Sequence, residues 1–153
     1  MKKKSNIPKQ IVNRRAKHDY ELDDSLVVGL ELTGAEVKAL RMGHGHLRGS
    51  YVTVKDNQLW LLNATITGSN SAPLTDEQKV RTRRLLAKRK EIDAFISAKQ
   101  QGRSIVPLQL LTGGRYIKLR MAGGRGKKLH DKRASLKEHD EKRAMSAAIK
   151  AMR

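Results

Sequence analysis

The sequence predicts a mainly β protein built from short antiparallel strands, with two or three short helices and a flexible basic C-terminal tail. Its 153 residues include several short runs rich in apolar and β-branched residues, bounded by Gly, Asn, Asp and Pro, which is typical of strands joined by tight turns. Large apolar residues become scarce after Met121. We therefore divide the chain into a disordered basic arm (residues 1–12), a compact domain (residues 13–121) and a basic tail (residues 122–153) that is mobile alone and helical when held.

The first half of the compact domain is predicted to form a strand, a helix and a hairpin. The pattern is strand-like from residue 16 to residue 32. Thr33 and Glu36 then have the spacing of a capping box, which predicts a short helix with its apolar side facing inward. A hairpin follows around the Asp56-Asn57 pair, which supplies the positive-φ geometry of a tight turn.

The second half is predicted to form a helix and two strands. A basic run over residues 79–90 leads into apolar residues at helical spacing, which predicts one helix that ends at Gly102. Residues 104–111 and 115–121 are predicted strands. Closing such strands into a small barrel removes exposed edges, and an oligonucleotide-binding-type barrel is one such solution. A small α+β domain with a different sheet order remains possible.

The charge of the chain favours a polyanionic partner. Thirty-three Lys and Arg residues against fifteen Asp and Glu residues give a formal net charge of +18, and such a surface binds polyanions by releasing their counterions. Nucleic acid and an anionic membrane face are both candidates, but no apolar run is long enough to span a bilayer. The Lys-rich start is not followed by an apolar segment, so we expect no export. The absence of cysteine excludes disulfides and thiolate metal sites, and it fits a cytoplasmic protein.

No pattern in the sequence indicates an enzyme. His44 and His46 lie close together, but no cysteine or clear carboxylate accompanies them, so we interpret them as an exposed turn rather than a metal site. No Gly-rich phosphate loop, nucleophile elbow or zincin motif is present. We expect no catalytic residue, no metal and no cofactor. A metal-dependent nuclease that uses the two histidines is the alternative from another functional class.

Basic side chains gather where they could contact phosphates. Acids are almost absent from residues 79–90, so ion pairs within a helix do not explain this run. On the last predicted strand, Lys118 and Arg120 share one face with Tyr116, which either stacks on an unpaired base or is a half-buried strand residue. In the tail, residues 130–133 either bind phosphates and a base or begin a helix. The spacing does not decide between these alternatives.

Base stacking cannot be the main mode of binding, because the chain has five aromatic residues. We interpret Tyr51, Trp60 and Phe95 as core residues. Contact with phosphates and recognition of the shape of a folded RNA fit the composition better.

Several blocks of the sequence resemble the small protein B (SsrA-binding protein) family. They keep their order and spacing over nearly the whole chain, and their combination is specific. The blocks are Asn13-Arg14-Arg15-Ala16 with His18 and Tyr20, residues 32–41, Ser50-Tyr51, residues 81–86 with Glu91-Ile92, and residues 126–128 with residues 130–133.

The resemblance implies an OB-fold-like antiparallel β-barrel and a non-catalytic adaptor of ribosome rescue. Such a protein binds the tRNA-like domain of transfer-messenger RNA (SsrA RNA), takes the place of the missing anticodon arm and enters stalled ribosomes with that RNA. The tail from His130 onward would enter the decoding site and the empty messenger channel, contact small-subunit ribosomal RNA and fold into a helix there. We expect a monomer on the RNA.

The resemblance also indicates binding residues. It implies an RNA-binding role for Glu36, Leu86 and Lys118, to which we add the nearby basic and aromatic side chains of Lys38, Arg41, Arg83, Arg84, Lys88, Tyr116 and Arg120. For the ribosome we expect contacts from the tail residues Lys127, Lys128, His130, Asp131, Lys132, Arg133, Leu136 and Lys137.

Some positions depart from the family pattern. Val27-Val28 precede Gly29 where the family commonly has an acidic residue, so an RNA contact through that acid is absent or replaced. Glu141 stands where the family tail often has an aromatic residue. A generic basic OB-fold RNA-binding or ribosome-associated protein is the alternative function.

Overall fold

The computed structural model describes residues 10–152, so residues 1–9 of the predicted basic arm lie outside the described residues. In chain order, the elements are β1 (Gln10–Val12), α1 (Ala16–Asp19), β2 (Tyr20–Leu30), α2 (Gly34–Arg41), β3 (Gly45–His46), β4 (Tyr51–Lys55), β5 (Gln58–Leu62), β6 (Thr65–Ile66), α3 (Asp76–Lys79), β7 (Arg83–Leu86), α4 (Arg89–Gln100), β8 (Ser104–Leu111), β9 (Lys118–Gly126) and α5 (Leu129–Ala151).

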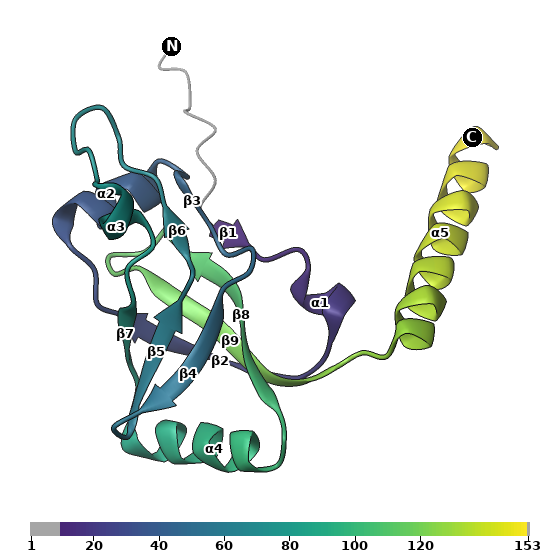
Figure 1. Ribbon diagram of the computed structural model, residues 1–153. Helices are drawn as coiled ribbons and strands as arrows, with labels where there is room; N and C mark the ends of the chain where they lie inside the picture. Colours follow the sequence, from purple (N-terminus) through teal and green to yellow (C-terminus); the bar gives the residue numbers. More distant parts are fainter. Residues whose placement is uncertain (1–9, 153) are drawn as a thin grey trace.

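Six strands form a nearly closed antiparallel ring (Figure 1), which confirms the predicted antiparallel sheet. Neighbours follow the order β8, β4, β5, β7, β2 and β9, and β9 pairs again with β8. The strand pairings around the ring differ in the number of residues that they include. β2 and β9 pair over nearly the whole of β2, whereas β4 and β8 share one register pair, Val52 with Ile105. Another part of the same sheet carries β1, which pairs with residues 109–111 of β8. We call the β4–β8 join the seam.

The core lies inside the ring because successive strand residues face opposite sides. Apolar strand side chains with 1 % or less of their surface exposed include Leu59, Leu61, Leu85, Leu119 and Met121. Helix α4 covers one end of the ring with Ile92 and Phe95, and α2 covers the other with Ala39 and Leu40. Among the described residues, α1 to α4 precede α5, which is more than the two or three helices predicted. The additional helices, α1 and α3, are single turns of four residues each.

Two local predictions are confirmed. The Thr33 hydroxyl accepts the N–H of Glu36 at 3.3 Å, and the Glu36 carboxylate accepts the N–H of Thr33 at 3.0 Å, so α2 begins with a complete capping box. Asp56 and Asn57 join β4 to β5 with φ angles of 52° and 57°. Both features need no distant partner, which is why the sequence pattern alone predicts them.

The predicted helix over residues 79–102 is wrong in its first half. Residues 83–86 form strand β7, and α4 begins at Arg89. Side chains of β7 alternate between the inside and the outside of the ring, which places the Arg83 guanidinium in the core. The pattern did not suggest a buried cation, because its carboxylate partner, Glu36, lies 47 residues earlier in the chain.

The ordered domain extends beyond its predicted strands. Residues 10–12, predicted as part of a disordered arm, form β1, and residues 16–19, predicted as strand, form α1. β9 continues to Gly126, so residues 122–126, predicted as the start of the mobile basic tail, are paired in the sheet. At Gly124 an added Cβ would lie 3.1 Å from a carbonyl oxygen of β2, so glycine allows this close approach of the two strands.

Helix α5 leaves the ring and stands apart from it (Figure 1). None of its described residues is buried, and large apolar side chains are exposed at Leu129, Leu136, Met145 and Ile149. A helix without a buried face gains little stability from tertiary packing. None of the helices between residues 10 and 152 is long and apolar enough to cross a membrane.

Candidate nucleic-acid interface

The buried carboxylate of Glu36 joins α2 to the segment that leads into β7. Its side chain is 1 % exposed and accepts two hydrogen bonds of 2.7 Å from Arg81 and one of 3.1 Å from Nε of Arg83. Burial acts to raise the pKa of Glu36, but the hydrogen bonds from Arg81 and Thr33 and the two guanidinium charges outweigh it and lower the pKa. Glu36 is therefore ionised at neutral pH.

Arg83 is fully buried, and its guanidinium is surrounded by acceptors. Besides Glu36, it donates to the carbonyl oxygens of Ala64, Gln78, Lys79 and Arg81. Burial lowers the pKa of Arg83 and the charge of Glu36 opposes this effect, yet an arginine remains protonated in proteins. Glu36 and Arg83, both predicted to bind RNA, therefore hold α2, α3 and β7 together from the inside, and in this structure their side chains are 1 % exposed or less.

On the outside of the ring, Leu86, Gly29 and Lys118 lie side by side on three adjacent strands. Gly29 of β2 is in register with Leu86 of β7 on one side and with Lys118 of β9 on the other. A Cβ at Gly29 would lie 3.1 Å from the Cβ of Leu86, so the absence of a side chain at Gly29 leaves a depression between Leu86 and Lys118. These residues line a cleft of about 500 Å³, which we call the Gly29 cleft. Leu86 is 50 % exposed there, so an apolar side chain and an ammonium group flank a flat floor.

Basic side chains surround the Gly29 cleft. Arg84 and Lys88 line it, and Arg120 lies two residues beyond Lys118 on the same outer face of β9. Glu91 also lines the cleft, but its carboxylate accepts the N–H of Lys88 at 2.8 Å and so caps α4. The local charge is therefore strongly positive.

A second hollow of about 340 Å³ adjoins the first at Lys118. Tyr116 is 68 % exposed there, and the Arg115 guanidinium lies 5.4 Å from the centre of its ring. Arg41 of α2 donates to the carbonyl oxygen of Arg115 at 2.8 Å, and Lys38 is exposed on the same helix. Tyr116 is thus an exposed ring rather than a half-buried strand residue. We call the outer face that carries both hollows, with Arg41, Arg84, Lys88 and Arg120 around them, the Lys118 surface.

The predicted core roles of the aromatic residues are only partly correct. Phe95 is buried at 8 % exposure, but Tyr51 is 46 % exposed. Trp60 is partly exposed on the outer face of β5, in register with Arg84, and its indole N–H donates to the Lys55 carbonyl oxygen at 3.3 Å. Trp60 therefore borders the Lys118 surface instead of filling the ring.

The histidine pair lies elsewhere. His46 is exposed, as predicted, but it belongs to strand β3, which pairs with β6, and not to a turn. Within residues 10–152, no group of three or more His, Cys, Asp or Glu side chains is placed to hold a metal ion.

Asp19, the last residue of α1, holds the base of the tail. Its carbonyl oxygen accepts the N–H of Lys127 at 2.8 Å, and its carboxylate lies 3.4 Å from Nζ of Lys132 and 3.0 Å from Nδ1 of His18. The hydrogen bond from His18 lowers the pKa of Asp19, with a further contribution from the charge of Lys132, against the effect of burial. Nζ of Lys127 donates to the Lys17 carbonyl oxygen at 3.0 Å, so Lys127 and Lys132, two cations predicted to contact the ribosome, are engaged within the protein.

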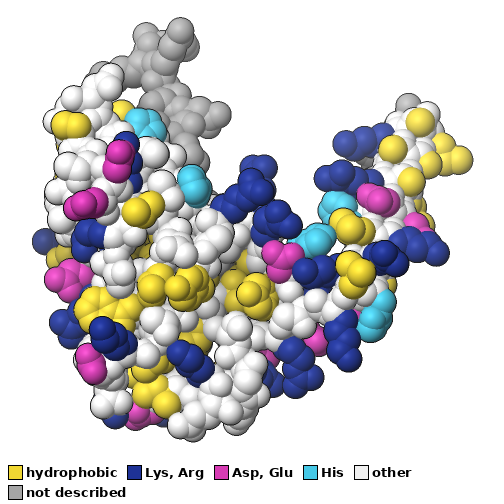
Figure 2. All heavy atoms as spheres, in the orientation of Figure 1, with side chains coloured by type: hydrophobic (Ala, Val, Ile, Leu, Met, Phe, Trp, Pro, Cys, Tyr) yellow, Lys and Arg dark blue, Asp and Glu magenta, His cyan; other side chains and the backbone are white. Residues whose placement is uncertain are grey.

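The other predicted tail residues face solvent. Lys128, His130, Asp131, Arg133, Leu136 and Lys137 are exposed along the first half of α5. Asp131 accepts the N–H of Lys128 at 3.3 Å, which caps the helix. Figure 2 shows Lys and Arg side chains spread along α5 and over the part of the body that faces it.

The structure adds functional candidates that the sequence did not indicate. Gly29 forms the floor of a cleft, Arg115 lies over an exposed aromatic ring, and Asp19 anchors the tail. Each acts through residues far away in the sequence, so no local spacing distinguishes it from an ordinary loop or strand residue. Gly29 is recognised as a binding-site residue only from the register of β7, β2 and β9, which places it between Leu86 and Lys118.

Comparison with known proteins is consistent with these observations. Residues 10–151 match a family model described as SmpB protein. The chain is 41 % identical over 140 residues to the SsrA-binding protein of Nostoc sp., which covers 90 % of each chain. It is 40 % identical over 152 residues to the SsrA-binding protein of Chelativorans sp., covering 98 % of each. A solved structure described as "tmRNA-SmpB: a journey to the center of the bacterial ribosome" matches with a TM-score of 0.66 and 33 % identity, over 80 % of this chain and 87 % of that one.

Proposed function

The chain belongs to the SmpB family, and from this premise we propose that it is a non-catalytic RNA-binding adaptor of trans-translation. It binds the tRNA-like domain of transfer-messenger RNA (SsrA RNA) and completes its tRNA mimicry in place of the anticodon arm. It then delivers this RNA to stalled ribosomes for rescue. The relatives named SsrA-binding protein and the similar structure of a tmRNA–SmpB assembly support this assignment.

The observation that carries the proposal is the row formed by Leu86, Gly29 and Lys118 on three adjacent strands. A nucleotide offers an apolar face on its base and a negative charge on its phosphate. The Gly29 cleft offers the complementary groups, an exposed leucine over a flat floor with an ammonium group beside it. The exposed ring of Tyr116 extends this surface beyond Lys118.

The charges around this row are available to phosphates. Among the described residues, none of the ion pairs involves Lys88, Lys118 or Arg120. Each phosphate contact releases counterions from the RNA and so contributes to affinity. The buried Glu36–Arg83 pair supports binding indirectly, because it fixes α2 and β7, from which Arg41 and Leu86 project.

The tail is the second functional part. Helix α5 has no buried face among its described residues, and it carries exposed cations together with exposed apolar side chains. Such a helix gains stability when a partner surrounds it. We assign it to the decoding site and the empty messenger channel of the small ribosomal subunit, where small-subunit ribosomal RNA would contact its first turns.

The nearly closed ring is, in this proposal, a barrel of the oligonucleotide-binding type, and it acts as one copy on each RNA. The helices α2 and α4 at its two ends and the single short seam fit a small closed barrel. The site of action is the cytoplasm, where ribosomes are found.

Competition binding tests the function directly. The labelled tRNA-like domain is bound to the full chain and displaced with unlabelled tRNA-like domain or with ordinary tRNA. We expect ordinary tRNA to compete far less well, because it retains its own anticodon arm. Equal competition would support the generic RNA-binding alternative instead.

A further inference from the structure

Val27 of β2 and Arg120 of β9 lie opposite each other on the outer face of the ring. The next pair on this face of the same two strands is Gly29 with Lys118, because residues two apart on a strand share a face. Val27 also lines the Gly29 cleft, so the Val27–Arg120 pair continues the Lys118 surface along β9. Both side chains of this pair are partly exposed.

The residues that flank Arg120 on the neighbouring strands carry no charge. Side chains that stand opposite each other on antiparallel strands are close enough to interact, and opposite charges at such positions attract each other. Arg120 has Val27 of β2 on one side and Gln109 of β8 on the other. Among residues 10–152, Arg120 takes part in none of the ion pairs. Its guanidinium charge is therefore available on the outer face.

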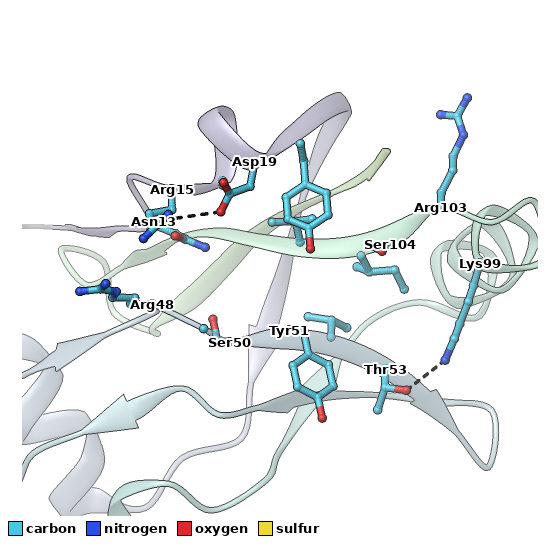
Figure 3. Close-up of a pocket in the computed structure, with 16 residues that line it drawn as sticks. Asn13, Arg15, Asp19, Arg48, Ser50, Tyr51, Thr53, Lys99, Arg103 and Ser104 are labelled. Carbon is cyan, nitrogen blue, oxygen red and sulfur yellow. Dashed lines mark hydrogen bonds and ion pairs between the residues drawn. The ribbon is translucent and has the colours of Figure 1, made fainter. Parts of the chain in front are cut away.

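Two cations near the seam, by contrast, have partners within the protein. The Arg103 guanidinium pairs with the carboxylate of Asp23. Lys99 donates to the Thr53 hydroxyl at 3.1 Å (Figure 3). The donors of these two side chains are thus engaged, whereas the cross-strand neighbour of Arg120 on β2 is an apolar side chain that accepts no hydrogen bond.

A free guanidinium next to Lys118 suits a second phosphate. Lys118 and Arg120 are two residues apart, about 6.6 Å along the strand, and they project from the same face. A planar guanidinium offers paired donors that match the oxygens of a phosphate. Val27 cannot compete for these donors, whereas a carboxylate at the same position would hold them within the protein.

We propose that Val27 is a specificity-determining residue of the Lys118 surface, because it leaves Arg120 free to bind a phosphate next to the one at Lys118. The inference rests on the proposed function and adds to it the course of the RNA backbone, which runs along β9 with successive phosphates at these two cations. An acidic side chain in place of Val27 pairs with Arg120 and removes one phosphate contact. The residue at position 27 therefore sets how many phosphates this surface binds.

Salt titrations of the binding of the labelled tRNA-like domain to the full chain test this arrangement. Arg120→Ala should lower the slope of log affinity against log salt by roughly 0.7 to 1, the value for one lost phosphate contact. Val27→Glu should lower the slope by the same amount, because the new carboxylate pairs with Arg120. Val27→Gln, in which the new side chain has the size of glutamate but no charge, should keep the slope.

The double variant of Val27→Glu and Arg120→Ala separates pairing from simple repulsion. A carboxylate that only repels the RNA would lower the slope equally with and without Arg120. A carboxylate that pairs with Arg120 should lower the slope no further in the Arg120→Ala background. Gln100→Glu is the matched control, since it adds the same charge at an exposed position of α4 that lines neither hollow; it should leave the slope unchanged.

The inference is overturned if Arg120→Ala leaves the slope unchanged, if Val27→Glu has the same effect in both backgrounds, or if Gln100→Glu lowers the slope as much as Val27→Glu. The Arg120→Ala result does not depend on the folding of Val27→Glu, which thermal unfolding of that variant checks. A failure of the proposed function shows separately, as equal competition by ordinary tRNA in the binding of the tRNA-like domain. The salt slopes would then still report whether Arg120 binds a phosphate.

Discussion

Glu36 on α2 and Arg83 on β7 form an ion pair of 3.0 Å in which both side chains are 1 % exposed or less. Removing one partner of such a pair leaves an uncompensated buried charge, which costs about 3–5 kcal/mol. We expect Glu36→Ala to lower the free energy of unfolding by about that amount, as measured by urea unfolding. Glu31→Ala, at an exposed glutamate nearby, should change it little; an equally small loss at Glu36 would contradict the role of the pair.

The same carboxylate should make stability depend on acid pH. Its pKa in the folded protein is lowered from 4.5, so below that pH the unfolded chain takes up protons more readily than the folded one. The contribution of the ionised Glu36 carboxylate to the free energy of unfolding is therefore complete above about pH 4.5, and it is lost as the pH falls through the pKa of Glu36 in the folded protein. Unfolding at a series of pH values should show a smaller acid loss for Glu36→Gln than for the unchanged chain. Parallel curves would assign the acid sensitivity to other carboxylates, such as Asp19.

Much of this fold is predictable from the sequence, but only where neighbours along the chain decide the structure. The Thr33–Glu36 capping box and the Asp56-Asn57 turn need no distant partner. Strand β8 coincides with the prediction because its apolar run is bounded on both sides by turn residues. In each case the local chemistry alone favours one backbone conformation.

The rest depends on contacts between segments far apart. Residues 83–86 have apolar and basic side chains that suit a helix, and they form a strand because Glu36 accepts the inward-facing guanidinium of Arg83. Gly124 continues β9 because β2 lies too close for a side chain. For the candidate site, the cations of the Lys118 surface were predictable as exposed charge. The role of Gly29 as the floor of the cleft was not predictable, because it depends on the side chains of Leu86 and Lys118 on the two neighbouring strands.

Substitutions in the Gly29 cleft, whether they remove a contact or fill the floor, should weaken RNA binding without unfolding the protein. Lys118→Ala should reduce affinity for the tRNA-like domain and lower the salt slope by roughly one unit, as for one lost phosphate contact. Leu86→Ala should reduce affinity with little salt effect, because it removes an apolar contact. Gly29→Val should also weaken binding, since its side chain would occupy the floor between them. Lys55→Ala is the control, at an exposed cation of the β4–β5 hairpin; similar losses from it would mean that only total charge matters.

Asp19 should set the direction in which α5 leaves the body, because its carboxylate and carbonyl oxygen both hold the base of the tail. The chain has no cysteine, so spin labels can be placed cleanly at Lys55→Cys and Glu141→Cys. We expect Asp19→Ala to broaden the distance distribution between these labels in pulsed electron resonance. Asp24→Ala makes the same charge change at an exposed site and should leave the distribution as it is. An unchanged distribution in Asp19→Ala would show that the hydrogen bond to the Lys127 N–H suffices.

Replacing Asp131, Lys132 and Arg133 together with Ala should separate the two functional parts. RNA affinity should remain within about twofold, because none of these residues lies on the Lys118 surface and single exposed substitutions have small effects on the fold. Rescue of stalled ribosomes, measured as tagging of a truncated product in a reconstituted translation system, should be lost. Equal loss of both activities would show that the tail also contributes to RNA binding. Since Lys132 also pairs with Asp19, the single variant Asp19→Ala distinguishes the causes: if it alone abolishes rescue, the direction of the helix is at fault, whereas if rescue persists, the lost contacts are those that α5 makes with the ribosome.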